Sequence, residues 1–317
     1  MKILANDGIS KIGIENLESN NFEVLTSKIE QEFLIDFINK NNIEVLLVRS
    51  ATKARKELID NCPNLKIIGR GGVGMDNIDV EHAKEKGIKV INTPTASSLS
   101  VAELVFTHFL NISRYVYDSN RKMPLEGEKR FKMLKKSYSK GTELKNKTLG
   151  IIGFGRIGQE VAKIGIGLGM NIIAHDKFIK KSIINISFFD NQKMNFEIKT
   201  TTMKNVLSES DFITFHIPKN EQKALIGKKE FEMMKDGVFI VNTARGGIVD
   251  ETELLQALEN GKVQAAGIDV FENEPNPSIK LLMNEKISLS PHIGGATIEA
   301  QDRIGLELAH QIINFYK

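Results

Sequence analysis

The sequence has little of several features that mark whole classes of protein. Only one of its 317 residues is a cysteine, Cys62, so the chain cannot form an internal disulfide. No apolar run approaches the length that spans a bilayer, and the opening MKILANDGIS has no signal-peptide core. The net charge of +3 is small, so charge alone indicates neither nucleic acid nor a membrane as a partner. These absences favour a cytoplasmic protein.

The chain is long enough for two domains, each with a core of its own. In residues 1–97, apolar segments alternate with helical patterns, which is typical of an open parallel α/β sheet. The expected strands are 2–5, 21–26, 44–48, 65–68 and 89–92.

Ligands of such sheets bind beyond the carboxyl ends of the strands. Arg49 and Ser50 follow one expected strand, and a glycine loop that includes Gly71 and Gly72 follows the next. For Arg49, as for Arg70, a substrate contact and a surface ion pair are equally open interpretations.

Residues 97–117 are predicted to form one long apolar helix that connects two domains. The following stretch, 119–147, holds ten Lys or Arg against three Glu. We favour a solvated loop and helix face for it over a positive field that attracts an anionic substrate.

Residues 148–176 carry a dinucleotide-binding pattern. Gly153, Gly155 and Gly158 form G-x-G-x-x-G between a buried strand and a helix. These glycines allow a tight turn, close approach to a pyrophosphate, and close packing of helix on strand, while the helix N-terminus attracts the anion. Asp176 ends the next strand, where a carboxylate binds the adenosine ribose and repels a 2′-phosphate. The pattern predicts NAD rather than NADP.

Further strands at 211–217, 238–242, 263–268 and 287–289 predict a second doubly wound sheet, which makes the chain an α/β protein with two such domains. Residues 186–198 are predicted to form a hairpin, and 296–316 a closing helix.

Three polar residues, Arg245, Glu274 and His292, follow strands of this second sheet. An arginine fork binds a carboxylate and polarises a neighbouring oxygen. A histidine accepts or donates a proton near neutral pH, and an acid beside it stabilises the imidazolium and fixes its tautomer. Together they suit hydride transfer between a nicotinamide and a 2-hydroxy acid. No spacing of metal ligands appears, so no metal is expected.

The chain resembles the D-isomer-specific 2-hydroxyacid dehydrogenase family along nearly its whole length. The matching stretches are GFGRIG at 153–158, NTARGGIVDE at 242–251, AGIDVFENEP at 266–275 and PHIGGAT at 291–297. The resemblance implies catalytic roles for Arg245, Glu274 and His292. It also implies a Rossmann domain. The further cofactor contacts that it implies are Arg156, Ile157, Asp176, Ile217, Pro218, Thr243, Ala244, Asp269 and Gly294, with Val73 as a loop contact on the nicotinamide side.

The resemblance also implies a domain organisation. Residues 1–97 with 291–317 would form a flavodoxin-like substrate domain, and 98–290 the NAD-binding domain, with the active site in the cleft between them. Members of the family are typically dimers through the cofactor domain, so a homodimer or larger homo-oligomer is expected.

Within the family, the chain most resembles the enzymes that oxidise 3-phosphoglycerate in serine biosynthesis. The stretches that support this resemblance include RSATK at 49–53 and GRGGVGMDNID at 69–79. It implies a phosphorylated 2-hydroxy or 2-oxo acid bound by Arg49, Ser50, Gly71, Gly72, Arg245 and His292. The stretch HIPKNEQKALI at 216–226 departs from the family pattern, and the chain ends at Lys317, so we expect no C-terminal regulatory domain.

Several alternatives stay open. They are a glyoxylate or hydroxypyruvate reductase, a D-lactate-type enzyme, a phosphoerythronate dehydrogenase, and a non-catalytic protein that senses NAD(H). A phosphate site at Arg49 separates the first interpretation from the other enzymes, and turnover separates all of them from the sensor.

Overall fold

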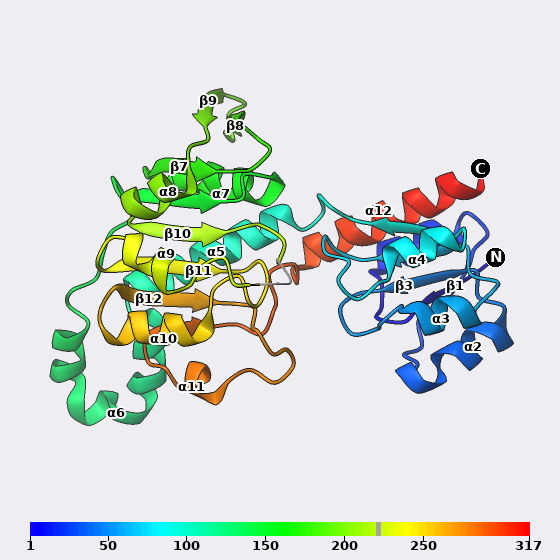
Figure 1. Cartoon of the computed structure of the whole chain (residues 1–317), viewed down its shortest axis with the longest axis horizontal. Coiled ribbons are helices and arrows are strands. Elements are labelled where there is room, and N and C mark those ends of the chain that lie inside the picture. Colours follow the sequence, from blue (N-terminus) through cyan, green and yellow to red (C-terminus); the bar gives the residue numbers. More distant parts are fainter. Residues whose placement is uncertain (220–222) are drawn as a thin grey trace. The chain divides into compact units, whose positions relative to one another are not determined.

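The computed structural model describes residues 1–219 and 223–317, which fall into two compact units (Figure 1). Unit 1 comprises Met1–Ser100 and Gly295–Lys317, and unit 2 comprises Val101–Gly294. The boundaries expected from the sequence, after residues 97 and 290, lie a few residues earlier. The first difference arises because the opening turn of helix α5 (Ser98–Ser113) belongs to unit 1 by its contacts.

Unit 1 is a parallel five-stranded sheet in the order β2-β1-β3-β4-β5. This is the flavodoxin-like order, in which the strand order reverses beside β1. The strands are β1 (Lys2–Ala5), β2 (Glu23–Leu25), β3 (Val45–Val48), β4 (Ile67–Arg70) and β5 (Lys89–Asn92). The helices are α1 (Lys11–Glu18), a 3-10 turn η1 (Gln31–Phe33), α2 (Leu34–Asn41), α3 (Lys56–Asn61), α4 (Val80–Glu85) and α12 (Ile298–Tyr316).

Unit 2 is built on a parallel six-stranded sheet in the order β13-β12-β11-β10-β6-β7. Its strands are β6 (Thr148–Ile152), β7 (Asn171–His175), β10 (Phe212–Phe215), β11 (Val238–Asn242), β12 (Val263–Ile268) and β13 (Ile287–Leu289). The helices are α5, α6 (Val116–Ser137), α7 (Arg156–Gly167), α8 (Met203–Glu209), α9 (Lys228–Met233), α10 (Glu251–Glu259) and α11 (Ile279–Leu282). The expected pair of doubly wound sheets is confirmed.

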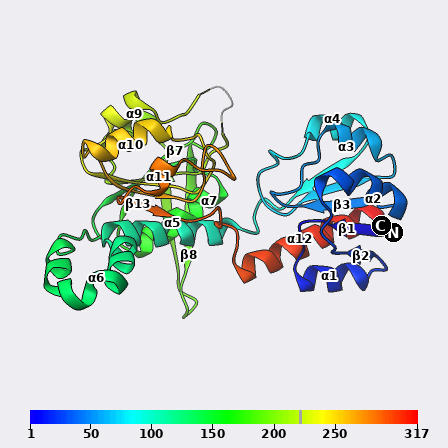
Figure 2. The same ribbon diagram turned by 90° about the horizontal axis from the view of Figure 1, so that it is seen from below.

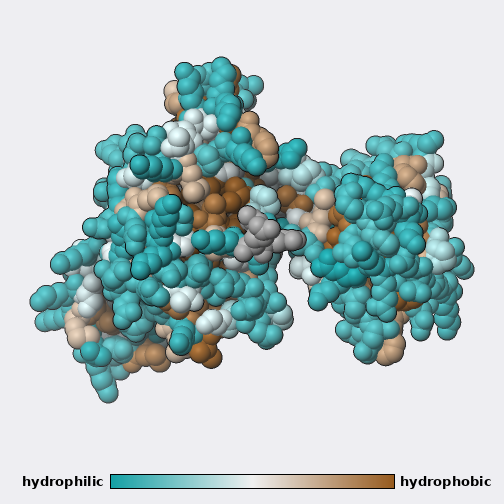
Figure 3. Space-filling view, viewed as in Figure 1, coloured by the Kyte–Doolittle hydropathy of each residue, from teal (hydrophilic) through white to brown (hydrophobic). Residues whose placement is uncertain are grey.

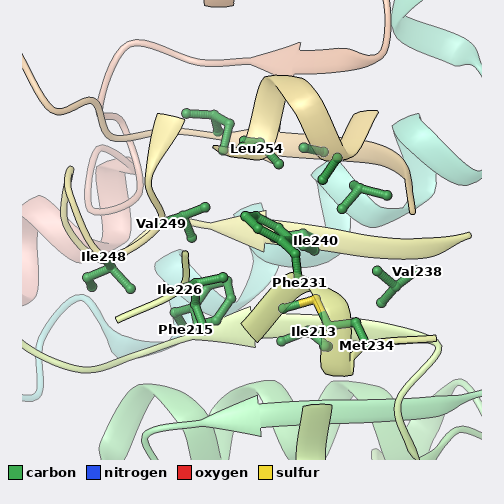
Figure 4. Packing of buried hydrophobic residues seen from close by; sticks show 14 of the residues in the cluster. Ile213, Phe215, Ile226, Phe231, Met234, Val238, Ile240, Ile248, Val249 and Leu254 are labelled. Carbon is green, nitrogen blue, oxygen red and sulfur yellow. The ribbon is translucent and has the colours of Figure 1, made fainter. Parts of the chain in front are cut away.

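The strands of both sheets are apolar because both faces are covered. Every residue of β3, β10 and β11 is buried, as a parallel sheet between helix layers requires. In unit 2, Phe231 of α9 and Leu254 of α10 pack with Ile240 of β11 in one cluster (Figure 4). These cores fix the strand ends, where the polar residues of interest lie.

A hairpin forms where one was predicted, but its first strand begins earlier than residue 186: β8 (Lys181–Ser187) pairs antiparallel with β9 (Lys193–Lys199). It extends away from the six-stranded sheet (Figure 2). Directly after it, Thr200 pairs with Ala174 in a single parallel bridge. Beyond β7, the six-stranded sheet is therefore extended only by this single bridge at Thr200.

The predicted single helix over 97–117 is wrong in its length. Helix α5 ends at Ser113, and Tyr115 adopts a left-handed φ of 57° before α6 begins. Most of the basic stretch forms helix α6, with a non-helical residue at Arg130, and the rest leads to β6 without regular structure. Charge composition marked this segment as solvated but did not reveal its apolar positions.

Helix α6 carries exposed apolar side chains among its charges, and Figure 3 shows hydrophobic patches on an otherwise hydrophilic surface. Leu125 is 85% exposed and Phe131 is 56% exposed. Among the described residues, no helix has both the length and the apolar character needed to cross a membrane.

Candidate active site

The glycine loop between β6 and α7 has the geometry that its sequence predicts. Gly153 has a φ of +96°, and a Cβ there would lie 2.4 Å from the carbonyl oxygen of His216. A Cβ at Gly158 would lie 2.2 Å from the carbonyl oxygen of Gly153, so the third glycine lets α7 approach the loop. A Cβ at Gly155 would meet nothing within 4 Å. The second glycine therefore leaves open space before the helix N-terminus, where a pyrophosphate is stabilised.

Asp176 follows β7 and holds this loop. Its carboxylate accepts hydrogen bonds from the backbone amides of Phe154 at 2.7 Å, Phe178 at 2.8 Å and Ile179 at 2.9 Å. Although partial burial works against its charge, these amides keep the pKa of Asp176 below its ordinary value. An ionised carboxylate has about four acceptor positions, so Asp176 retains one acceptor position beyond these three hydrogen bonds.

Most of the remaining residues predicted to bind cofactor in unit 2 lie just after neighbouring strands. Ile217 follows β10, and its Cγ2 would lie 2.7 Å from a Cβ on Gly153. Thr243 follows β11, and within the described ranges its buried Oγ1 has no hydrogen-bond partner. A buried hydroxyl without a partner is costly unless a ligand supplies one. The open loop and this hydroxyl fit a bound dinucleotide. The other residues of this set are Arg156 and Ile157 in the first turn of α7, Pro218, and Ala244.

Arg245 lies in a turn that the side chain of Asn242 shapes. Asn242, which is buried at the end of β11, donates to the carbonyl of Arg245 at 3.0 Å and accepts from the amide of Ala244 at 3.1 Å. A Cβ at Gly246 would lie 1.7 Å from the carbonyl oxygen of Phe271. The glycine after Arg245 therefore brings this turn against the loop that carries Glu274.

His292 and Glu274 meet, as their positions after neighbouring strands suggested. The Nδ1 atom of His292 lies 2.8 Å from Oε2 of Glu274, and both side chains are partly exposed. Oε1 of Glu274 accepts from the amide of Phe271 at 2.9 Å, which fixes the carboxylate. Since a carboxylate only accepts, Nδ1 carries the hydrogen and Nε2 is left to exchange a proton.

His292 has a left-handed φ of 54°, and Asp269 holds the backbone that follows it. Asp269 is fully buried and accepts from the amides of Ile293 at 2.8 Å and Gly294 at 3.0 Å. Ser290 donates to it at 2.6 Å. Burial raises the pKa of Asp269, although these hydrogen bonds and the charge of His292 work the other way. The sequence suggested Asp269 as a cofactor contact, and its carboxylate also organises the His292 segment.

In unit 1, Arg49 and Ser50 follow β3 in a turn that Asp7 holds. Asp7 accepts from the amide of Arg49 at 2.7 Å and from that of Thr52 at 3.0 Å, while Lys28 donates to it at 2.5 Å. Although burial works against its charge, the hydrogen bonds from Lys28, Arg49 and Thr52 keep the pKa of Asp7 below its ordinary value. Among the described residues, the Arg49 guanidinium makes no hydrogen bond or ion pair.

The glycine loop of unit 1 lies beside this turn. A Cβ at Gly71 would lie 3.6 Å from Cγ of Arg49, and one at Gly72 would lie 1.5 Å from Nη1 of Arg70. Gly72 has a φ of +144°, which favours glycine. Val73 is partly exposed, and its carbonyl accepts from Asn92 at 2.8 Å. The structure thus gathers the residues predicted to bind substrate in unit 1 at the ends of β3 and β4.

Residues 106–294 match the family model described as "D-isomer specific 2-hydroxyacid dehydrogenase, NAD binding domain". The chain belongs to this family. It is an NAD-dependent D-2-hydroxyacid dehydrogenase, and the sequence-based assignment of family, fold and cofactor is confirmed.

The relatives of this chain are named for different activities. The chain is 42% identical over 316 residues to "Hydroxypyruvate reductase" of Thermotoga maritima, covering 98% of this chain and 97% of that protein. It is 40% identical over 320 residues to "D-3-phosphoglycerate dehydrogenase" of Archaeoglobus fulgidus, covering 100% of this chain and 58% of that protein. The chain therefore spans little more than half of that relative.

Among solved structures, a glyoxylate reductase from Paecilomyes thermophila superposes with a TM-score of 0.80 at 30% identity, over 98% of this chain and 93% of that one. Because 98% of this chain is covered, the likeness includes residues of both units.

Two residues that shape the candidate site were not found from the sequence. Asp7 follows β1 and Asn242 ends β11, so both stand at carboxyl ends of strands. The rule that identified Arg49 would have included them. The departure from the family pattern at 216–226 includes Asn220, Glu221 and Gln222, which lie outside the described residues. Within those residues, no cluster of three or more His, Cys, Asp or Glu side chains is arranged to hold a metal.

Proposed function

We propose that this dehydrogenase oxidises 3-phosphoglycerate to 3-phosphohydroxypyruvate, the reaction that starts serine biosynthesis, and that Arg245, Glu274 and His292 are its catalytic residues. The single observation that carries the chemistry is the 2.8 Å contact between His292 and Glu274, behind the turn that presents Arg245.

Bound NAD supplies the hydride acceptor. Arg245 binds the substrate carboxylate and polarises the C2 oxygen, since its guanidinium forms two parallel hydrogen bonds. Nε2 of His292 takes the proton of the C2 hydroxyl as the hydride leaves the same carbon. Glu274 stabilises the imidazolium that forms, and in the reverse direction the same nitrogen returns the proton.

In this proposal Arg49 binds the phosphate group of the substrate. Its guanidinium makes no hydrogen bond or ion pair with other described side chains, although its backbone is fixed by Asp7. A fixed backbone with an available guanidinium is suited to a phosphate, which arginine binds in a bidentate manner. In this proposal unit 1 contributes the phosphate contact and unit 2 the cofactor and the acid–base pair.

A second candidate is reduction of hydroxypyruvate, an unphosphorylated 2-oxo acid. It is favoured by the similarity to the Thermotoga protein, because the two chains match along almost their full lengths. The chemistry at Arg245, Glu274 and His292 would be the same, and only the contacts at the far end of the substrate would differ.

A panel of substrates separates these candidates. The purified protein is assayed with 3-phosphoglycerate, D-glycerate and D-lactate in oxidation, and with phosphohydroxypyruvate, hydroxypyruvate and glyoxylate in reduction, each with the NAD and NADP couples. We expect the highest kcat/KM for the phosphorylated pair, with NAD. Preference for hydroxypyruvate would support the second candidate, and absence of turnover with every pair would support a sensor that binds NAD(H) without catalysis.

A cytoplasmic homodimer is proposed as the working form. The exposed apolar side chains of α6, which include Leu125 and Phe131, support a dimer, because exposed apolar surface is often covered by a partner. Light scattering should give about twice the mass of one chain. Leu125→Asp with Phe131→Asp should give monomers, whereas Phe189→Asp, at an exposed hairpin turn, serves as the control.

A further inference from the structure

A histidine from a helix of unit 2 is connected to the candidate catalytic histidine through the partly buried Ser290 and the buried Asp269. His108 lies on α5, is only 2% exposed, and is followed on its helix by the buried Phe109 and, one turn on, by the buried Ile112. Its Nδ1 lies 3.0 Å from Oγ of Ser288, and its Nε2 lies 2.9 Å from Oγ of Ser290. Ser290 is the residue whose hydroxyl donates to Asp269 at 2.6 Å.

The packing is built around this side chain. A Cβ at Gly267 would lie 2.5 Å from Cβ of His108, so β12 has a glycine where α5 presents the imidazole. A buried polar group costs stability unless it is hydrogen-bonded, and both ring nitrogens of His108 have partners. The helix, β12 and β13 are thus fitted to one another at a polar contact inside an otherwise apolar core.

The directions of these hydrogen bonds follow from counting hydrogens. A serine hydroxyl has one hydrogen, and an ionised carboxylate has none. Because Ser290 gives its hydrogen to Asp269, its oxygen must accept from Nε2–H of His108. Nδ1 then bears no hydrogen and accepts from Ser288. Burial lowers the pKa of His108 to about 4, which agrees with a neutral ring that holds a single hydrogen.

We propose that His108 is a positioning residue for His292, acting through Ser290 and Asp269 as one directed hydrogen-bond relay. Each donor in the relay polarises the next, so the Ser290 hydroxyl becomes a better donor to Asp269. Asp269 is thereby held in its orientation, and it accepts from the amides of Ile293 and Gly294. His292 keeps its left-handed backbone and its contact with Glu274. This inference rests on the proposed catalytic role of His292 and adds to it a support outside the reacting groups.

Few charged groups lie near this relay. Within it, Asp269 follows β12 and Ser290 follows β13, and they are joined by a hydrogen bond. Outside it, His292 acts on Asp269 by its charge. Glu274 acts on His292 from the loop after β12. In the described ranges, Asp269 forms no salt bridge with a lysine or arginine.

The first test needs no substrate. In protein labelled with ¹⁵N-histidine, the ring nitrogens of His108 are assigned by comparison with His108→Gln. We expect a neutral ring with hydrogen on Nε2 at pH 7. A ring with hydrogen on Nδ1, or a charged ring, would overturn the relay.

The second test breaks the relay at defined links. Ser290→Ala and His108→Leu remove the link to Asp269, His108→Gln keeps a donor, and Ser288→Ala removes only the distal link. We expect Ser290→Ala and His108→Leu to lower kcat about three- to tenfold, as loss of one hydrogen bond predicts, with KM for NAD within about twofold. Amide exchange at Ile293 and Gly294 should quicken by a similar factor. His108→Gln should restore most of both, and Ser288→Ala should change neither by more than about twofold.

Ile240→Val is the matched control, because it loosens the core of the same unit at a residue outside the relay. It should lower Tm without changing exchange at Ile293 and Gly294 relative to the rest of unit 2. If Ser290→Ala and His108→Leu behave like this control, the relay is merely structural and the inference is wrong. If the wild type turns over no substrate, the proposed function fails while the tautomer and the exchange rates still decide the relay.

Discussion

In unit 1 the turn that carries Arg49 is held by Asp7, and in unit 2 the segment that carries His292 is held by Asp269. Both carboxylates accept from two backbone amides just beyond parallel strands. They differ in what supports their charge. Lys28 pairs with Asp7, whereas Asp269 is supported by the hydroxyl of Ser290.

This difference moves the two pKa values in opposite directions, down for Asp7 and up for Asp269. A lysine makes the turn of unit 1 insensitive to pH near neutrality. Among the described residues no lysine or arginine pairs with the fully buried Asp269, so the His292 segment depends on the hydroxyl and amide donors of that carboxylate. We infer that the proposed phosphate contact is anchored more robustly than the proposed acid–base pair.

The largest effect is expected where unit 2 performs chemistry. His292→Ala should lower kcat by about 10²–10⁴-fold, the usual contribution of general acid–base catalysis. Steady-state kinetics in both directions measure this, and KM for NAD should stay near the wild-type value. A loss below tenfold would assign the proton transfer to another group.

Glu274→Gln tests the partner of that histidine. It should lower kcat by about 10- to 100-fold, because a hydrogen bond to a charged group contributes about 1.5–3 kcal/mol. Steady-state kcat in both directions checks this, with Glu272→Gln as the control in the same loop. An unchanged rate would remove Glu274 from the mechanism.

Arg49→Ala tests the contribution of unit 1. It should raise KM for the phosphorylated substrate by about tenfold or more, the effect of one charge-assisted hydrogen bond, and leave kcat and the unphosphorylated analogues near wild type. Lys53→Ala, which changes a neighbouring exposed cation, is the control. Equal effects on phosphorylated and unphosphorylated substrates would favour the hydroxypyruvate reductase candidate.

The smallest effect is expected on the way in which stability depends on pH. Thermal unfolding of the wild type, Asp7→Asn and Asp269→Asn at a series of pH values measures it. The pKa of Asp7 lies below its ordinary value of 3.8, so its contribution is complete above that value and is lost as the pH falls through the folded pKa. The pKa of Asp269 is raised, so its contribution is greatest at low pH and declines as the pH rises above 3.8. As the pH rises, the difference in stability between wild type and Asp7→Asn should therefore increase, whereas the difference between wild type and Asp269→Asn should decrease. If both differences changed in the same direction, the contrast between the two carboxylates would be wrong.

Much of this structure follows from local sequence patterns. The strands at 89–92, 148–152, 238–242, 263–268 and 287–289 have the predicted bounds, because buried parallel strands are short apolar runs with turn residues at each end. Helix α5 was predicted too long, because its apolar periodicity continues past the residue, Tyr115, whose left-handed backbone ends it.

Within the candidate site, the meeting of Glu274 and His292 followed from the rule that parallel strands end at one edge. The supporting contacts did not follow in the same way. Which amides Asp7 and Asp269 accept from depends on turn geometry and on packing between distant elements. The pairing of His108 with Ser290 joins residues 182 positions apart, and a lone histidine in an apolar helix gives no indication of such a partner.

The burial of Cys62 makes this chain well suited to site-specific labelling. The thiol is fully buried in unit 1, and burial raises its pKa to about 11, so it carries little reactive thiolate at neutral pH. Cysteines introduced at Phe33 in unit 1 and at Phe189 in the hairpin turn, both well exposed, would then be labelled by a maleimide in preference to Cys62. With a spin label at each of these two positions, the distance between the units could be measured in solution, with and without NAD, and the natural cysteine would not have to be removed first.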